Sequence, residues 1–303
     1  MAFSVTQPNF NGKAAGFYIN AALNEAKSLT YLTVMENVKY KENIQKMAGS
    51  SLIVNGDCNA FTSSGNLALT ETTLTPKDLQ VNLAICKKTL ITSYEALQMR
   101  AGRDAGAPVA FEDYVISYIG EIIANGTETS IWTGNDASAG EFTGFVGGGV
   151  GHLVTDGTVV DVAKTGATFD ATNIVTNLSA TLEAVPSAVY MKEDLHIYMS
   201  AKSFRLYIQK MSQDGYVNAY SMNRDYEAVF EGVRLAVCPG MKDNVLVAAE
   251  KSNLFFGTDL LSDSTRISIL DQALVTGSDN INVVARYTAG TIQGIGSDIV
   301  LTS

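Results

Sequence analysis

The sequence has little of the chemistry on which enzymes and metal-binding proteins depend. Its 303 residues include two histidines, one tryptophan and three cysteines. The cysteines, Cys58, Cys86 and Cys238, are odd in number and far apart and form no C-x-x-C motif, which argues against a disulfide framework or a zinc site. We interpret them as buried, apolar thiols of a protein that stays in a reducing cytoplasm.

Charged residues are also scarce. Asp, Glu, Lys and Arg make up 17% of the chain, below the roughly 25% of a typical soluble domain. This shortfall suggests that part of the surface is covered by other subunits, although Ser, Thr and Asn also cover surfaces. The 21 basic and 31 acidic residues give a net charge of −10, which argues against a dedicated nucleic-acid binder. A container for DNA is compatible with this balance, and so is simple solubility.

Long apolar runs and targeting signals are missing as well. The segment Met1–Phe10 has no basic run and no apolar stretch, so we do not interpret it as a signal peptide. No apolar run approaches the ~18 residues that a membrane-spanning helix needs. We therefore expect no contact with a membrane.

No arrangement of residues is typical of a catalytic, cofactor or metal site. His152 and His196 are far apart and flanked by apolar residues, which favours structural or surface roles. The run Gly147-Gly148-Gly149 lacks the G-x-G-x-x-G spacing of a phosphate cradle, and we predict a flexible loop there. The pairs Glu112-Asp113 and Glu193-Asp194 are explained by a helix start and a turn. The sequence predicts no catalytic, cofactor-binding or metal-binding residues and no enzymatic activity.

The residue pattern in the first third of the chain predicts an arm that is followed by strands of a long hairpin. A helix is expected over about Lys13–Leu29. Turn signals around Asn55-Gly56 and Ser64-Gly65 then separate short β-branched and aromatic runs. These runs are Tyr31–Val34, Ser51–Val54, Leu67–Leu69 and Val81–Ile85. A long, polar hairpin of this kind is a poor isolated structure, so we expect it to lie on another surface.

The strongest helical pattern follows. Pro108 favours a helix start, and apolar residues at helical spacing continue from Phe111 to Ile123. We expect Asn125-Gly126 to stop this helix, which places it over residues 109–124. Such a helix needs a wide apolar partner, such as a sheet. Trp132 then lies in the following loop, where we interpret it as a core residue in preference to a recognition residue.

The second half alternates helices and strands, which indicates an α+β protein. Asp170 and Ser200 are predicted to cap two amphipathic helices, which end near Pro186 and Asp214-Gly215. Strands are expected at Leu195–Met199, Val229–Val237, Val245–Ala249, Leu254–Phe256, Ile267–Leu270, Ile281–Ala285 and near Ile299.

Five short motifs follow one another along the chain. They are Leu74-Thr75-Pro76-Lys77-Asp78-Leu79, Ile131-Trp132-Thr133-Gly134-Asn135 leading into Phe142-Thr143-Gly144-Phe145, Phe230–Leu235, Asn244–Ala248 and Asp279–Ala285. Together with the order of arm, hairpin, long helix, glycine-rich loop and mixed domain, they resemble the major capsid proteins of tailed bacteriophages, which have the Hong Kong 97-like capsid fold. The resemblance covers roughly residues 65–302.

This resemblance implies a division of the chain into five parts. They are an N-terminal arm with a short helix (1–35), an extended hairpin loop region (36–90), a peripheral domain with a spine helix at 109–124 (91–150), an axial domain (151–265) and returning strands of the peripheral domain (266–303). Some members of the family cross-link this loop through a Lys and an Asn. Lys39, Lys41 and Lys46 lie near the hairpin, but no motif identifies such a pair.

The implied function is structural. A subunit of this family assembles with itself into hexamers and pentamers of an icosahedral shell, which encloses double-stranded DNA without binding it specifically. Portal and scaffolding proteins are implied as partners, with decoration proteins in some members. The implied location is the virion, with assembly in the host bacterial cytoplasm.

Three other interpretations stay open at the level of the sequence. An encapsulin, which is a cellular container with the same fold, is the first. It would enclose a cargo enzyme, and the genes of the two proteins would be neighbours. A tail or decoration protein is the second. An enzyme is the third, and a sealed pocket that joins His152 or His196 to a carboxylate would favour it.

We predict that deletion of about residues 40–65 leaves a soluble core that does not form shells, because the hairpin can bury its apolar residues only on a neighbour. Electron microscopy of the purified deletion variant measures this. Particles of normal form would contradict the role of the hairpin.

Overall fold

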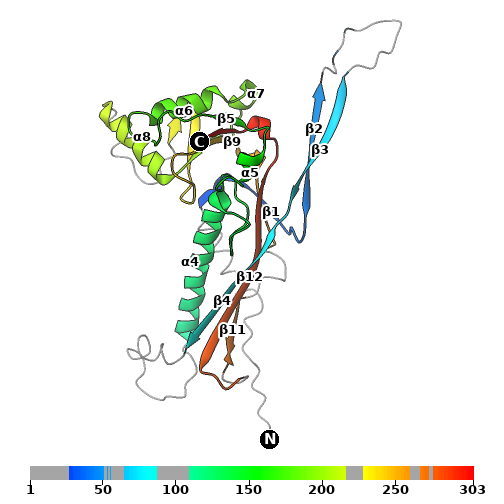
Figure 1. The fold of residues 1–303 in the computed structure, drawn as a ribbon, viewed down its shortest axis with the longest axis vertical. Helices are drawn as coiled ribbons and strands as arrows, with labels where there is room; N and C mark the ends of the chain where they lie inside the picture. The colour runs from blue at the N-terminus through cyan, green and yellow to red at the C-terminus, as the bar shows by residue number, and fades with distance from the viewer. Residues whose placement is uncertain are drawn as a thin grey trace.

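The computed structural model describes residues 27–50, 53, 55, 65–86, 109–215, 228–259, 267–272 and 276–303, without the side chains of 48–50, 66, 109–118, 267–269 and 271. These parts of the chain form two large sheets, one two-stranded hairpin and a long helix (Figure 1). Most of the helix predicted at Lys13–Leu29 and most of the strand predicted at Ser51–Val54 lie outside the described residues. The described end of the former is η1, a 3₁₀ helix at Lys27–Tyr31.

The first sheet is organised around its longest strand, β12 (Asn280–Gln293). β4 (Lys77–Cys86) pairs antiparallel with β12 along one side. β11 (Ile267–Asp271) and then β10 (Leu254–Thr258) pair antiparallel with the other side, and β1 (Thr33–Glu36) extends the sheet parallel to β10. Strands far apart in the sequence are thus joined in one five-stranded sheet, in which β12 binds three of them.

The second sheet has six strands in the order β5-β13-β9-β6-β8-β7. Their bounds are Val160–Val162, Val300–Thr302, Leu246–Glu250, Leu195–Met199, Val233–Val237 and Val229–Phe230. The central strands β6 and β9 are buried at every position. Alternate residues of these strands therefore face two different cores.

One core lies between the six-stranded sheet and the helices above it. It contains Ile197 and Met199 of β6, and apolar residues of α6 (Ile174–Glu183), α7 (Ser187–Tyr190) and α8 (Ala201–Gln213). Asp170 accepts hydrogen bonds from the backbone N–H groups of Thr172 and Asn173 before α6, and Ser200 accepts one from Ser203 at the start of α8. The predicted cap at Ser200 is therefore confirmed, whereas the N-cap of α6 is Asn173, which makes no side-chain capping bond, and Asp170 stabilises the turn ahead of it.

The other core joins the two sheets. Tyr198 and Val247 of the six-stranded sheet meet Val283 and Ala285 of β12 there, together with Trp132 from the long helix. The indole of Trp132 is fully buried and lies 5.3 Å from the ring of Tyr198 and 5.5 Å from that of Phe145, measured between ring centroids. Trp132 is a core residue, as predicted.

The long helix, α4 (Val109–Thr133), continues past its predicted end at Ala124. Asn125 and Gly126 are exposed, so solvent accommodates them, and the ~1 kcal/mol propensity cost of an interior glycine is small. Burial of Ile131 and Trp132 in the following turns offsets that cost. Trp132 therefore belongs to the last helical turn, and its predicted position in a loop is wrong.

The segment between α4 and the run Gly147-Gly148-Gly149 is a hydrogen-bonded cap of the helix, and the run itself, for which the sequence predicted a flexible loop, continues into a turn in which Gly148 and Gly149 are exposed. The N–H groups of Phe145 and Val146 donate to the carbonyls of Ile131 and Trp132 at 2.8 and 2.7 Å. These carbonyls lack partners within the helix, as at any helix C-terminus. The approach requires glycine, because a Cβ on Gly134 would lie 2.2 Å from the carbonyl oxygen of Phe142.

Other predicted strands are present with changed limits. The strand expected at Val229–Val237 is two strands, β7 and β8, separated by a turn with positive φ at Glu231 and Gly232. The strand expected near Ile299 among the returning strands of the peripheral domain is β13, which pairs with β9 and β5 in the six-stranded sheet. A three-residue strand carries no signal of which sheet it joins.

We predict that Trp132→Ala lowers the free energy of unfolding by about 3–5 kcal/mol, because it leaves a cavity where both sheets and α4 meet. It also removes the hydrogen bond from the indole N–H to the Ser28 hydroxyl. Denaturant titration measures the change, with Tyr40→Ala at a 77% exposed position as the control. Equal stabilities of the two variants would contradict the assignment of this core.

Candidate functional site

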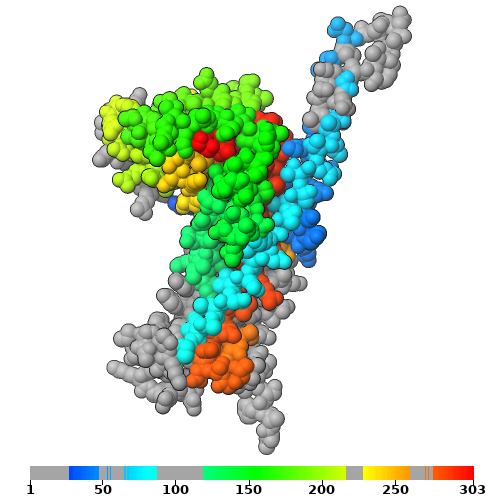
Figure 2. All heavy atoms as spheres, in the orientation of Figure 1, coloured from blue at the N-terminus to red at the C-terminus, as the bar shows by residue number. Residues whose placement is uncertain are grey.

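The hairpin of β2 (Glu42–Ser50) and β3 (Asn66–Leu74) projects from the body (Figures 1 and 2). Its two faces carry different side chains. Met47 pairs with Leu69, and side chains two residues apart on a strand share a face. Met47, Leu67 and Leu69 therefore lie on one face, where they are 67%, 56% and 57% exposed. We call these three residues the outer hairpin face. Exposed apolar side chains gathered on one face are typical of an interaction surface.

The opposite face packs at the root of the hairpin against the body. Leu74 is fully buried there, in a small cluster with Val38 and Ile292, to which Ile44 and Phe255 also pack. Gly257 of β10 forms the floor of this contact, since a Cβ at that position would lie 2.4 Å from a methyl carbon of Leu74. This apolar contact fixes the direction in which the hairpin leaves the body.

Polar side chains join the two strands on the outer side near the root. Glu71 accepts hydrogen bonds from the amides of Asn43 and Gln45 at 3.4 and 3.2 Å, and the hydroxyl of Thr73 donates to Asn43 at 3.0 Å. By strand alternation these residues share a face with Met47 and Leu69. The outer side is thus polar at the root and apolar further out.

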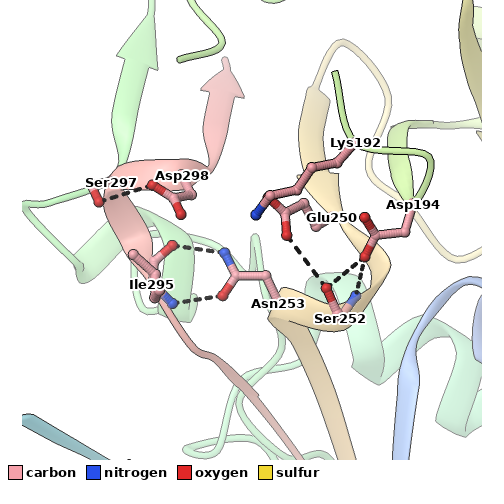
Figure 3. Close-up of polar contacts among 8 residues, drawn as sticks. All are labelled: Lys192, Asp194, Glu250, Ser252, Asn253, Ile295, Ser297 and Asp298. Atoms are coloured by element: carbon pink, nitrogen blue, oxygen red, sulfur yellow. Dashed lines mark hydrogen bonds and ion pairs between the residues drawn. The ribbon is translucent and has the colours of Figure 1, made fainter. Parts of the chain in front are cut away.

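A second polar network lies where the two large sheets meet (Figure 3). Lys192 forms an ion pair with Glu250 at 2.6 Å, and the Ser252 hydroxyl donates to Asp194 at 2.6 Å. The hydrogen bond to Glu250 raises the pKa of Lys192. Partial burial acts to raise the pKa of Asp194, but hydrogen bonds from Ser252 outweigh this and lower it. Both groups are therefore charged at neutral pH.

The N-terminal part of the described chain is anchored on the end of α4. Glu128 is buried and accepts hydrogen bonds from the N–H and hydroxyl of Ser28 at 3.0 and 2.5 Å and from Gly240 N–H at 3.3 Å. A buried carboxylate is costly unless such donors surround it. Neither Glu128 nor the network of Figure 3 belongs to a motif that sequence reasoning recognises.

The two histidines do not form a catalytic arrangement with a carboxylate in the described residues. Burial lowers the pKa of both, and His196 makes a hydrogen bond through Nδ1 to the backbone oxygen of Asp194. His152 lines a hollow of about 320 Å³ that Asp136 also lines. The Asp136 carboxylate is 66% exposed and pairs with Lys77 at 2.7 Å, so the hollow is not the sealed pocket that would favour an enzyme.

The sequence also led us to expect that the cysteines are buried thiols. Cys238 is buried, and burial raises its pKa well above the usual range, but Cys86 is exposed, so the expectation of buried thiols is wrong for Cys86. Cys58 lies outside the described residues. Within the described part of the chain, no group of three or more His, Cys, Asp or Glu side chains is placed to hold a metal ion, and no helix is long and apolar enough to cross a membrane.

We predict that Leu74→Ala lowers the free energy of unfolding by about 2–5 kcal/mol, because the fully buried side chain leaves a cavity at the hairpin root. Leu69→Ala, five residues earlier on the same strand, changes it by less than about 0.5 kcal/mol, because the side chain is exposed in the subunit. Denaturant titration of the unassembled protein compares the two. A Leu69→Ala loss as large as that of Leu74→Ala would contradict the assignment of the faces.

Comparison with known proteins finds relatives by structure alone. No family model and no curated protein matches the sequence. The capsid of a native GTA particle matches with a TM-score of 0.65 and 12% identity, over 100% of this chain and 95% of that chain. A structure of Mycobacterium phage Adephagia matches with a TM-score of 0.60 and 13% identity, over 92% and 89%. A virus-like particle from Pyrococcus furiosus matches with a TM-score of 0.54 and 9% identity, over 96% and 98%.

Identities this low carry information about the fold, and the matches span nearly the whole chain. The two-sheet body, the long helix and the projecting hairpin are the arrangement that the resemblance to phage capsid proteins implied (Figure 1). The chain therefore has the Hong Kong 97-like capsid fold, in the α+β class that its sequence predicted.

Proposed function

We propose that this chain is the major capsid protein of a tailed bacteriophage, with a structural rather than an enzymatic role. Its copies assemble into hexamers and pentamers of an icosahedral shell around double-stranded DNA. The observation that carries the proposal is the outer hairpin face, which exposes Met47, Leu67 and Leu69 on a fold that matches capsid subunits along its whole length.

The physical argument concerns what the subunit leaves exposed. Each large apolar side chain contributes about 1.5–3 kcal/mol when it is fully buried. The hairpin cannot bury its outer face on its own body, because its opposite face, through Leu74 and Ile44, already lies there. A second copy supplies the missing surface, and closed symmetry repeats the same contact around the shell.

The parts of the chain take their roles from this arrangement. The five-stranded sheet with α4 forms the peripheral domain, and the six-stranded sheet with α6, α7 and α8 forms the axial domain near the capsomer centre. In the domain limits proposed from the sequence (1–35, 36–90, 91–150, 151–265 and 266–303), we now assign β13 to the axial sheet and β1, β4 and β10 to the peripheral sheet, following their strand pairing.

The proposal also includes partners and a location. Portal and scaffolding proteins act during assembly in the host bacterial cytoplasm, decoration proteins bind the finished shell where they are used, and the mature protein lies in the virion. The net charge of −10 supports a wall that encloses DNA without binding it. The solved procapsid of satellite phage P4, which includes a size determination protein, has the same fold with a TM-score of 0.56 at 12% identity.

The first test is electron microscopy of the purified protein together with its mass by light scattering. Shells, tubes or capsomer rings are the expected result, either from the protein alone or with the scaffolding protein of its own phage. A protein that stays monomeric under both conditions would overturn the proposal.

A sharper test uses the outer hairpin face. We predict that the combined change Met47→Ser, Leu67→Ser and Leu69→Ser abolishes shells and leaves the unfolding of the subunit nearly unchanged, because all three side chains are exposed before assembly. The matched control is Ala68→Ser with Thr70→Ser, on the other face of β3, which still forms shells. Wild-type yields of particles from the triple variant would contradict the role of this face.

A cellular container of the encapsulin type is the second candidate, and the match to the virus-like particle from Pyrococcus furiosus favours keeping it. Particles isolated from the native source separate the two. DNA inside the particles supports the phage capsid, and an enclosed enzyme supports the container.

A further inference from the structure

In the described part of the chain, three connections link the two large sheets, and all three meet at one place. β9 passes to β10 through η2 (Lys251–Asn253), and β12 passes to β13 through η4 (Gly296–Asp298). The third connection runs from α4 through α5 (His152–Thr155) to β5. The angle between the sheets depends on how these connections are held together.

Asn253 of η2 binds the second connection through both ends of its side-chain amide (Figure 3). Its Nδ2 donates to the carbonyl of Ile295 at 2.8 Å, and its Oδ1 accepts from the N–H of Ile295 at 2.6 Å. Its own carbonyl accepts from Gly294 N–H at 2.9 Å. The residue is 8% exposed, so water competes little for these bonds.

The residues around this contact are closely packed. A Cβ on Gly294 would lie 2.6 Å from Oδ1 of Asn253, and one on Gly296 would lie 2.5 Å from Asp156 at the end of the third connection. The Gln293 amide also donates to His152 O and to Asp156, each at 3.1 Å. The second connection is therefore bonded to the first through Asn253 and to the third through Gln293.

The type of contact matters as much as its position. Apolar contacts are non-directional and tolerate sliding, whereas a two-point amide contact loses both bonds when one partner rotates. On the other flank, Lys251 N–H donates to Asp194 O at 2.9 Å, and Ser252 donates to the Asp194 carboxylate, so η2 is held from both sides. We call the place where the three connections meet the junction. Its directional hydrogen bonds resist changes of the angle between the two sheets.

The elements that leave the junction amplify any such change. β12 has 14 residues and extends away from Gln293, so its far end lies about 45 Å from the junction at about 3.4 Å per residue. A rotation of about 10° at the junction would move that end by about 8 Å, twice the ~4 Å separation of contacting side chains. Contacts between copies at both ends could not form together.

From these observations we infer that Asn253 is a positioning residue for assembly, which sets the angle between the two sheets and thereby the curvature and uniformity of the shell. The inference rests on the proposed shell function. Asn253 need not touch a neighbouring copy to do so, because it acts through the orientation of the sheets that do.

The test compares Asn253→Asp with Asn253→Ala. Asn253→Asp keeps the volume and the acceptor for Ile295 N–H, but at neutral pH it places a carboxylate oxygen against the carbonyl of Ile295. Protonation restores a donor there. Ser297→Ala is the control on the same turn, because the side chain is exposed and bonds only to its neighbour Asp298 among the described residues.

We predict that both Asn253 variants give particles of shifted and broadened diameter at neutral pH, measured by electron microscopy, while wild type and Ser297→Ala give one size. Asn253→Asp regains the wild-type diameter in acid, as pH falls below the pKa of the new carboxyl, which is about 4 in an unperturbed aspartate and is raised by burial. Asn253→Ala does not. Hydrogen exchange at Ile295 N–H in the unassembled Asn253→Ala subunit increases roughly tenfold or more, because the amide loses its acceptor.

The outcomes separate the two proposals. If wild-type protein forms no particles with or without its scaffolding protein, the shell function fails, and this inference fails with it. If wild type forms shells and the Asn253 variants form shells of the same diameter, with faster exchange at Ile295, only this inference is overturned. If Asn253→Ala does not fold, the acid-dependent recovery of Asn253→Asp decides: its absence counts against the inference.

Discussion

The structure depends on one shared apolar core between two sheets that belong to the same chain. The indole of Trp132 lies at the centre of it, where the end of α4 meets β6 and the glycine-rich cap. Burial in this core holds the helix, both sheets and the anchored segment at Ser28 together, through the indole N–H as well as through apolar contact. The polar bonds around Asn253 and Glu128 then specify the geometry that a non-directional core leaves open.

The hairpin shows how one element serves two partners. Strand alternation gives it two faces, and the chain uses one of them, through Leu74 and Ile44, to bind its own body. The other face carries Met47, Leu67 and Leu69 and has no apolar partner within the described subunit. Stability of the subunit and association between subunits can therefore change independently, because different side chains of the same two strands carry them.

Local patterns predicted much of this architecture. The cap at Ser200, the turn at Asp170 and most strands follow from short-range rules, because the interactions that determine them lie within a few residues. The hairpin was indicated by the turn signals between its two strands. Asn125-Gly126 misled the prediction of the helix end, since the burial of Trp132 that overrides it depends on strands about a hundred residues away. The pairing of β13 and the contacts of Asn253 and Glu128 are likewise long-range, and no single-sequence pattern encodes them. The bonds of the glycine-rich cap span about 14 residues, and they too belong to no pattern that the sequence showed. The order of the elements along the chain predicted the fold and indicated its proposed function, whereas no single site residue did.

The described N-terminal segment binds to residues that are synthesised much later, so the subunit can finish folding only near the end of its synthesis. Among the described strands, β1 pairs with β10 alone, and Thr30 O accepts a hydrogen bond from Lys251, 221 residues later in the chain. At about 5–20 residues per second, a ribosome needs about 10–45 s to synthesise the partners of a segment that it has already released. During that interval β1 has an unpaired edge, and the earlier hairpin already exposes apolar side chains. During most of the synthesis of a nascent chain, β1 therefore lacks its partner strand. The local concentration of nascent chains on neighbouring ribosomes then determines how often β1 pairs with another copy instead of with its own β10.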